Sequence, residues 1–172
     1  MPLERVTSFD DLLAFLAEEQ ASFRHDAAAQ IVQLPTTSGP LDGSLFIRWE
    51  RHVPFVQLVA PMIHDVPDER VHELEDALCR VNHAALLPGF GYDFAKRFLY
   101  CRLTLARDDE GVSATLLRKM LFAAVNNARD YLAPFRAIVA GEPAARIAQL
   151  VRNEERARQM EMAEGVGAAF KD

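Results

Sequence analysis

The sequence predicts an α+β fold: an antiparallel five-stranded sheet with helices on one face, followed by a C-terminal helical extension. The expected order is helix, three strands, helix, two strands, helix. Apolar residues recur at helical spacing in three segments and alternate with polar residues in several short segments. Short connections join the strand-like segments. They favour antiparallel pairing, because a parallel pair needs a long crossover.

The first helix is expected to begin at Ser8, whose hydroxyl can accept a hydrogen bond from the free backbone donors of a helix N-terminus. Asp10 and Asp11 follow, and their negative charge complements the positive end of the helix dipole. The apolar residues of this segment recur at helical spacing and define one hydrophobic face: Phe9, Leu12, Leu13, Leu16 and Phe23.

Three strands are expected next, over residues 30–34, 44–50 and 55–60. The second and third alternate between two faces, as half-buried strands do. We expect Pro35 to end the first strand and Pro61 to end the third, because proline cannot donate a ladder hydrogen bond.

The second helix is expected to have Pro67 in its first turn, followed by Asp68 and Glu69, which complement the dipole. Its apolar stripe consists of Val71, Leu74, Leu78, Val81 and Ala85. A hairpin should follow, with strands over residues 90–94 and 98–105.

Ser113 is expected to cap a third helix, and Pro134 to kink or restart it because proline removes a backbone donor. A stretch rich in Ala, Glu, Arg and Met then predicts further helix. With 172 residues the chain can bury one good core and is short for two. We therefore expect one α+β domain over residues 1–140 and a C-terminal helical extension over residues 141–172.

The chain carries a formal net charge of −6, and its basic residues are scattered. Such a charge repels phosphates and anionic membrane surfaces, so we expect neither nucleic acid nor a membrane as partner.

Cys79 and Cys101 lack the spacing of a zinc or redox motif and are interpreted as small buried groups in a reducing compartment. The first residues lack the pattern of a signal peptide, and no stretch is long and apolar enough to span a bilayer, so the expected location is cytoplasmic.

The paired strands over residues 44–50 and 55–60, the helix from Pro67 to His83, and the aromatic hairpin over residues 90–102 follow a known order. This order resembles the class I type III secretion chaperone fold and the related YbjN-like family of candidate sensory-transduction regulators. The resemblance implies a homodimeric binding module with no cofactor and no chemistry. Chaperones of this fold are small and acidic, and hold an extended stretch of another protein against apolar grooves.

We therefore expect a non-enzymatic, cytoplasmic binding module that holds a peptide segment or partner protein on apolar surface, in a chaperone-like way. The alternative is a small-molecule-sensing or signalling regulator of the YbjN-like type, in which the aromatic residues of the hairpin line a pocket.

Five metal-ligating residue types lie close together in the sequence: His64, Asp65, Asp68, His72 and Asp76. Nothing marks further ligands at helical or hairpin spacing, so we expect no metal and no other cofactor.

No serine lies in a nucleophile elbow, and neither cysteine has a histidine beside it in the sequence, so no catalytic residue is predicted. A hydrolase that uses His64 or His72 with neighbouring carboxylates is the remaining catalytic alternative.

A set of apolar residues shares one side of the predicted strands and forms the candidate partner-binding surface: Phe46, Phe55, Val59, Phe98 and Tyr100. An aromatic cluster on an uncovered sheet face would mark an interface, first for a dimer and second for a peptide. The alternation leaves the direction open. It equally allows the side carrying Leu45, Ile47 and Trp49 to face outward, or helices to cover both faces.

Overall fold

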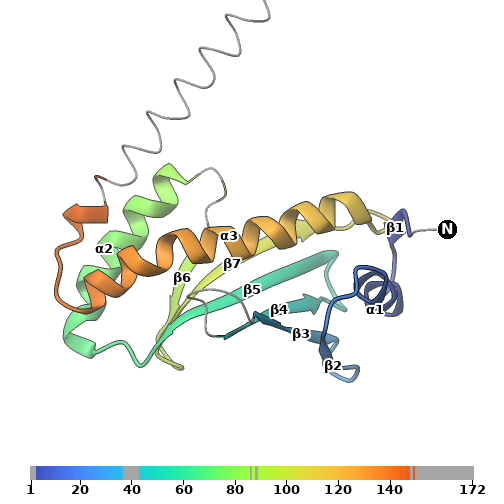
Figure 1. Cartoon of the computed structure of the whole chain (residues 1–172), viewed down its shortest axis with the longest axis horizontal. Helices are drawn as coiled ribbons and strands as arrows, with labels where there is room; N and C mark the ends of the chain where they lie inside the picture. The colour runs from blue at the N-terminus through green and yellow to red at the C-terminus, as the bar shows by residue number, and fades with distance from the viewer. Residues whose placement is uncertain (1–2, 37–42, 86, 88, 148, 150–172) are drawn as a thin grey trace, which may run out of the picture. The chain divides into compact units, whose positions relative to one another are not determined.

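The computed structural model describes residues 3–36, 43–85, 87, 89–147 and 149. Figure 1 shows the order of helices and strands. The chain divides into two compact units, the first comprising Met1–Asp65 and Gly89–Ala133 and the second Val66–Pro88 and Pro134–Asp172. The division falls within helix α3 (Ala114–Val139), at the step to Pro134.

The first unit contains a six-stranded sheet in the order β2-β3-β4-β5-β7-β6, with every neighbouring pair antiparallel. Its strands are β2 (Arg24–Asp26), β3 (Ile31–Thr36), β4 (Gly43–Trp49), β5 (Phe55–His64), β6 (Phe90–Asp93) and β7 (Phe98–Ala106). The predicted α+β class and the antiparallel pairing are confirmed. The predicted count of five strands is wrong, because β2 adds a sixth.

The sequence pattern does not predict strand β2, because all three of its residues are polar and exposed. It pairs with Ile31–Gln33 of β3, and the carboxylate of Asp26 accepts a hydrogen bond from the backbone N–H of Ala29 in the turn between the strands. Short, charged edge strands are common in natural sheets because they discourage pairing with other chains. Such a strand has no apolar alternation by which the sequence could reveal it.

Both strands that were expected to end at a proline continue past it, so these two predictions are wrong. Strand β3 includes Pro35, which lies beyond the residues of β3 that pair with β2 and therefore has β4 on one side only. Strand β5 runs through Pro61 to His64, and its register with β7 shifts between Pro61 and Ile63. A bulge of this kind lets a strand tolerate a missing backbone donor.

Helix α1 (Phe9–Glu18) begins as predicted, with Ser8 at its N-cap. The Ser8 hydroxyl accepts from the Asp11 N–H, and the Asp11 carboxylate accepts from the Ser8 N–H, which makes a capping box. The expected helical stripe is too long: Gln20 has a positive φ of 55°, so the chain leaves the helix before Phe23.

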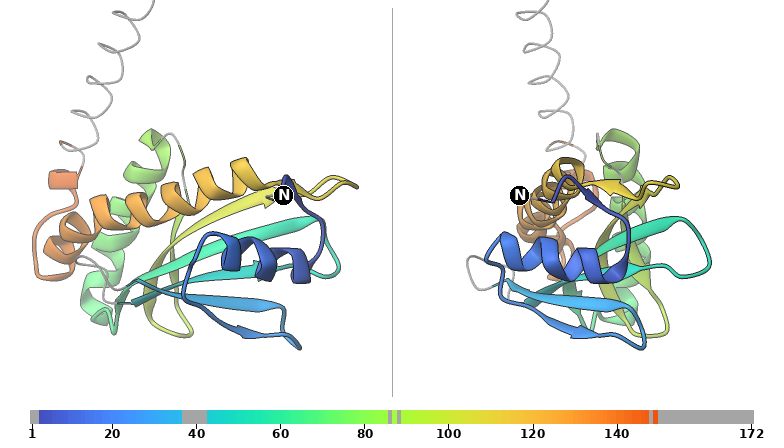
Figure 2. Two further views of the ribbon diagram at one scale, coloured as in Figure 1. Left: turned by 45° about the vertical axis from the view of Figure 1, so that its right-hand side comes forward. Right: turned by 90° about the vertical axis from the view of Figure 1, so that its right-hand side faces the viewer.

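Helix α1 and the part of α3 up to Ala133 lie on the same face of the sheet, as Figure 2 shows. The strand residues on this inner face are buried: Val32, Leu45, Ile47, Trp49, Val56, Leu58, Ala60, Leu99, Cys101, Leu103 and Leu105. The side carrying Leu45, Ile47 and Trp49 therefore faces inward, and the predicted aromatic set lies on the outer side of the strands.

Strands β1 (Arg5–Val6) and β8 (Val112–Ser113) form a separate two-stranded antiparallel sheet. Helix α3 follows directly, and the Ser113 hydroxyl accepts from the Leu116 N–H at 3.5 Å. The helix is continuous through Pro134 to Val139 and does not restart there.

The second unit contains α2 (Asp68–Ala84), and Pro67 is its N-cap residue, one position before the first turn in which it was expected. The guanidinium of Arg70 donates to the carbonyl oxygens of Ile138 and Glu142, and the Glu73 carboxylate accepts from the Ala144 N–H.

Most of the predicted C-terminal extension, residues 148 and 150–172, lies outside the described residues. No helix in the described part of the chain has the length and apolar content to cross a membrane.

Candidate binding face on the sheet

The outward side chains of the central strands surround a hollow of about 450 Å³, which we call the sheet hollow. Its apolar lining consists of Ile31, Phe46, Val59, Pro61, Phe98 and Tyr100. Its polar lining consists of Arg48, Gln57, Asp93, Lys96 and Arg102. The residues come from five different strands and from the turn between β6 and β7, so the register of the sheet assembles the hollow.

The structure brings together four of the five predicted surface residues. Phe46 and Val59 are direct partners across β4 and β5, and the rings of Phe98 and Tyr100 lie 5.7 Å apart between centroids. All four are half-buried. Phe55 is 38% exposed at the start of β5, paired with Ala106, and does not line the hollow.

Tyr100 forms a wall of the sheet hollow because its ring lies against the neighbouring strand. Gly91 of β6 is its direct partner, and a Cβ atom at Gly91 would lie 2.6 Å from the Tyr100 Oη and 2.7 Å from its Cζ. Glycine therefore leaves the space that the ring occupies. The guanidinium of Arg102 lies 5.6 Å from the centroid of the same ring, within reach of a cation–π interaction.

The charges around the sheet hollow are mostly positive. Arg48 pairs with Glu50 at 3.5 Å, whereas the side chains of Lys96 and Arg102 make no ion pair with any residue that the structure describes. The single carboxylate, that of Asp93, accepts from the Lys96 backbone N–H. In a chain with a net charge of −6, this face is suited to attract carboxylates.

Sequence reasoning identified the aromatic residues of this face and missed its cations. The signal was present, because Arg48 follows Phe46 by two positions and Arg102 follows Tyr100 by two, which places each cation on the same side of its strand. Lys96 had no such signal, since it belongs to the turn and reaches the hollow only through the hairpin geometry.

Five metal-ligating residue types lie close together in the sequence, His64, Asp65, Asp68, His72 and Asp76, although no metal is expected there. Within the described residues, no group of three or more His, Cys, Asp or Glu side chains is placed to hold a metal ion. His64 stacks on Phe98, with ring centroids 5.6 Å apart and an interplanar angle of 25°, and Asp76 pairs with Arg80 at 3.0 Å.

The two cysteines have different surroundings. Cys101 is buried as expected, and burial raises the pKa of its thiol to about 12, so the reactive thiolate is suppressed at neutral pH. The expectation that Cys79 is also buried is wrong: it is exposed on α2.

No protein-family model matches the chain, and no curated protein matches it. Among solved structures, the chain is similar to YbjN from Escherichia coli, a protein described as a candidate transcription regulator. The two are 17% identical with a TM-score of 0.60, over 77% of this chain and 95% of YbjN. The chain therefore has a YbjN-like fold, which confirms the predicted resemblance to the fold of the YbjN-like family.

Proposed function

We propose that this protein is a non-enzymatic binding module that holds a peptide segment of a partner protein in the sheet hollow. The observation that carries the proposal is the combination of half-buried aromatic side chains with cations that have no ion pair among the described residues, on the outer sheet face of an acidic chain. The segment that fits has apolar side chains with aspartate or glutamate close by.

The apolar contacts and the ion pairs would contribute differently to binding. Burial of apolar surface contributes about 25 cal/mol for each Å² removed from water, and Phe46, Val59, Phe98 and Tyr100 all retain exposed area. An exposed ion pair contributes only about 0.2–1 kcal/mol. The apolar contacts therefore supply most of the affinity, and Arg102 and Lys96 select and orient the segment.

A selection from a random twelve-residue peptide library on the full chain tests the proposal. We expect enriched peptides that combine aromatic or aliphatic residues with acidic ones. Arg102→Glu should weaken the binding of an enriched peptide by about tenfold, measured by fluorescence anisotropy, since it reverses a charge beside the ligand. Tyr100→Ser should weaken it as well, because it removes a wall of the hollow.

Matched controls lie outside the hollow on the same unit. Lys119→Glu reverses a charge and Leu116→Ala removes an exposed apolar side chain, and neither residue lines the hollow. Both variants should bind an enriched peptide as the parent chain does. A library that yields no enriched peptide, or peptides bound equally well by Arg102→Glu, would contradict the proposal.

A homodimer remains part of the proposal. Light scattering after size-exclusion chromatography would show a mass of about twice the 19.3 kDa of one chain. If Tyr100→Ser converts a dimer to a monomer, the sheet hollow is the dimer interface and the peptide proposal fails.

A small-molecule regulator is the second candidate, because Phe98 and Tyr100 of the hairpin line the hollow and the similar YbjN is described as a candidate regulator. A ligand that binds the folded state raises the melting temperature by mass action. A thermal-shift screen of metabolites separates the two functions: a hit that Tyr100→Ser abolishes supports the regulator, and a flat response contradicts it.

A further inference from the structure

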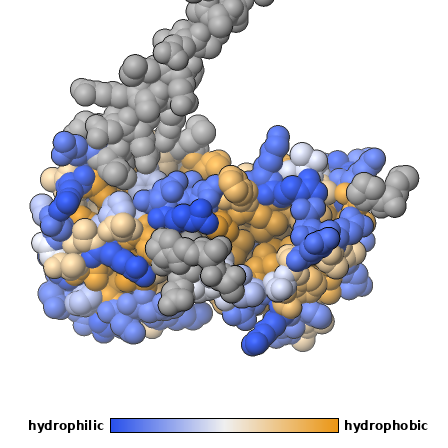
Figure 3. Space-filling view, viewed as in Figure 1, coloured by the Kyte–Doolittle hydropathy of each residue, from blue (hydrophilic) through white to orange (hydrophobic). Residues whose placement is uncertain are grey.

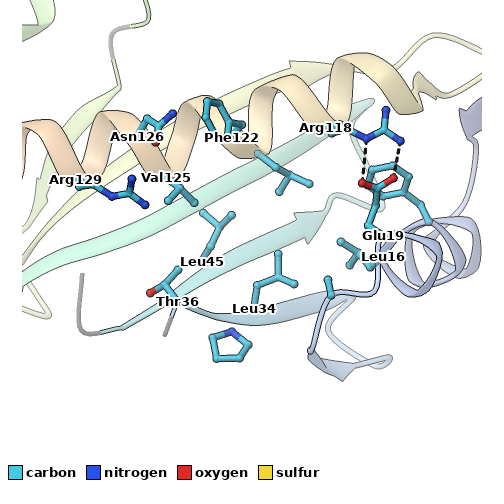
Figure 4. Close-up of a pocket in the computed structure, with 14 residues that line it drawn as sticks. Leu16, Glu19, Leu34, Thr36, Leu45, Arg118, Phe122, Val125, Asn126 and Arg129 are labelled. Carbon is cyan, nitrogen blue, oxygen red and sulfur yellow. Dashed lines mark hydrogen bonds and ion pairs between the residues drawn. The ribbon is translucent and has the colours of Figure 1, made fainter. Parts of the chain in front are cut away.

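A second hollow in the first unit lies between α1 and α3, above the inner side of β3 and β4, and has a volume of about 380 Å³. We call it the helix groove. In Figure 4, Leu34 and Leu45 point from the strands toward α3, and Val125 points from α3 toward the strands. Figure 3 shows hydrophobic surface in this region. The walls are therefore apolar along the length of the groove.

The two ends of the helix groove differ in charge. At one end Arg118 donates to both carboxylate oxygens of Glu19, at 3.0 and 2.5 Å, so the cation is neutralised. At the other end lies Arg129, next to Asn126. The side chain of Arg129 makes no hydrogen bond or ion pair with the described part of the chain. Among the described residues, the groove thus ends in one positive charge that has no ion-pair partner.

Phe122 borders the groove and is 70% exposed, which is unusual for so large an apolar side chain. An occupant of the groove would lie against this ring and cover part of it. The volume is at the lower end of the roughly 300–1,000 Å³ typical of small-ligand pockets.

We propose that the helix groove binds a single-chain carboxylate, such as a medium-chain fatty acid. Its hydrocarbon tail lies along Leu34, Leu45 and Val125, and its carboxylate pairs with the guanidinium of Arg129. Arginine suits this role because its planar donors match a carboxylate. The site is separate from the sheet hollow and does not depend on the function proposed there.

Titration of the ¹⁵N-labelled full chain with decanoate, followed by NMR, tests the site. We expect shift changes centred on Leu34, Leu45 and Val125. Arg129→Gln should weaken the binding of decanoate by about threefold to tenfold, because the ion pair between Arg129 and the carboxylate is partly exposed and its energy is moderate. The neutral analogue 1-decanol should bind the parent chain and Arg129→Gln equally.

Two further variants separate binding from effects on folding. Lys119→Gln removes an exposed cation from the same helix without lining the groove, and should bind decanoate as the parent chain does. Val125→Trp fills the groove and should abolish binding of both decanoate and 1-decanol. Shift changes located elsewhere, decanoate binding unchanged in Arg129→Gln, or equal weakening by Lys119→Gln would each overturn the proposal.

Discussion

The guanidinium of Arg107 lies 4.2 Å from the centroid of the Trp49 ring and also donates to the carbonyl oxygens of Glu50 and Val53. Trp49 ends β4, and Arg107 directly follows β7. One side chain therefore fixes the connection after β4 to the end of a strand that is distant in the sequence.

Arg107→Lys should lower the free energy of unfolding by about 1–2 kcal/mol, because an ammonium cannot stack on the ring and donate in the same fork geometry. Urea denaturation followed by the fluorescence of Trp49 measures the loss. The control is Arg80→Lys, which alters an exposed pair with Asp76 and should change stability by less than about 0.5 kcal/mol. Equal losses in the two variants would contradict this role.

Gly111 is expected to be far less replaceable than Gly141, although both have a positive φ. A Cβ atom at Gly111 would lie 2.1 Å from the carbonyl oxygen of Val6, whereas nothing lies within 4 Å of one at Gly141. Gly111→Ala should cost about 3 kcal/mol or more in unfolding free energy, since backbone strain and a backbone clash add. Gly141→Ala should cost only the strain, about 1–2 kcal/mol. Denaturation midpoints that shift equally would show that the approach to Val6 is not rigid.

The parts of the fold that could be predicted are those whose signal is local. The Ser8 cap, the start of α2 within one residue of Pro67 and the hairpin of β6 and β7 depend on nearby residues, and the structure confirms all three. The parts that could not be predicted depend on distant partners. Strands β1 and β8 have two residues each and exist only because they pair across most of the chain.

The candidate site shows the same limit. Alternation placed Phe46 and Tyr100 on one side of their strands, but burial was needed to show that this side is the outer one. The position of Arg102 over the Tyr100 ring and the approach of Gly91 to Tyr100 depend on the register between strands. That register is set by tertiary pairing, which a single sequence does not display.

Asp11 makes stability depend on pH at the start of α1. The Thr7 hydroxyl, followed by the backbone N–H of Thr7 and the donors of Ser8, holds the pKa of the Asp11 carboxyl below its ordinary value. Because the folded pKa is the lower one, this stabilisation is present above about pH 4 and is lost as the pH falls through the folded pKa.

Asp11→Asn should therefore flatten the decline in unfolding free energy between about pH 5 and pH 2, measured by urea denaturation at a series of pH values. Asp10→Asn is the matched control, because it removes an exposed first-turn carboxylate outside the capping box. The same decline in Asp11→Asn as in the parent chain would assign the acid sensitivity to other groups.

The two cysteines should differ sharply in reactivity. Cys79 is exposed, whereas Cys101 is buried and burial raises its pKa to about 12. A thiol reagent at pH 8 should label one cysteine per native chain, and Cys79→Ser should abolish this labelling until urea unfolds the protein. Rapid native labelling of Cys79→Ser would show that the sheet opens around Cys101.

Gly91 and Tyr100 should be energetically coupled, because the ring occupies the space where a Cβ atom at Gly91 would lie. Alanine normally suits a strand better than glycine, yet Gly91→Ala should destabilise the parent chain by about 1–2 kcal/mol as it displaces the ring. In a Tyr100→Ala background the ring is absent, so the same substitution should be neutral or stabilising. A double-mutant cycle by urea denaturation should give a coupling of about 1 kcal/mol or more. Additive effects would mean that the ring moves aside freely, and Tyr100 would then be no fixed wall of the sheet hollow.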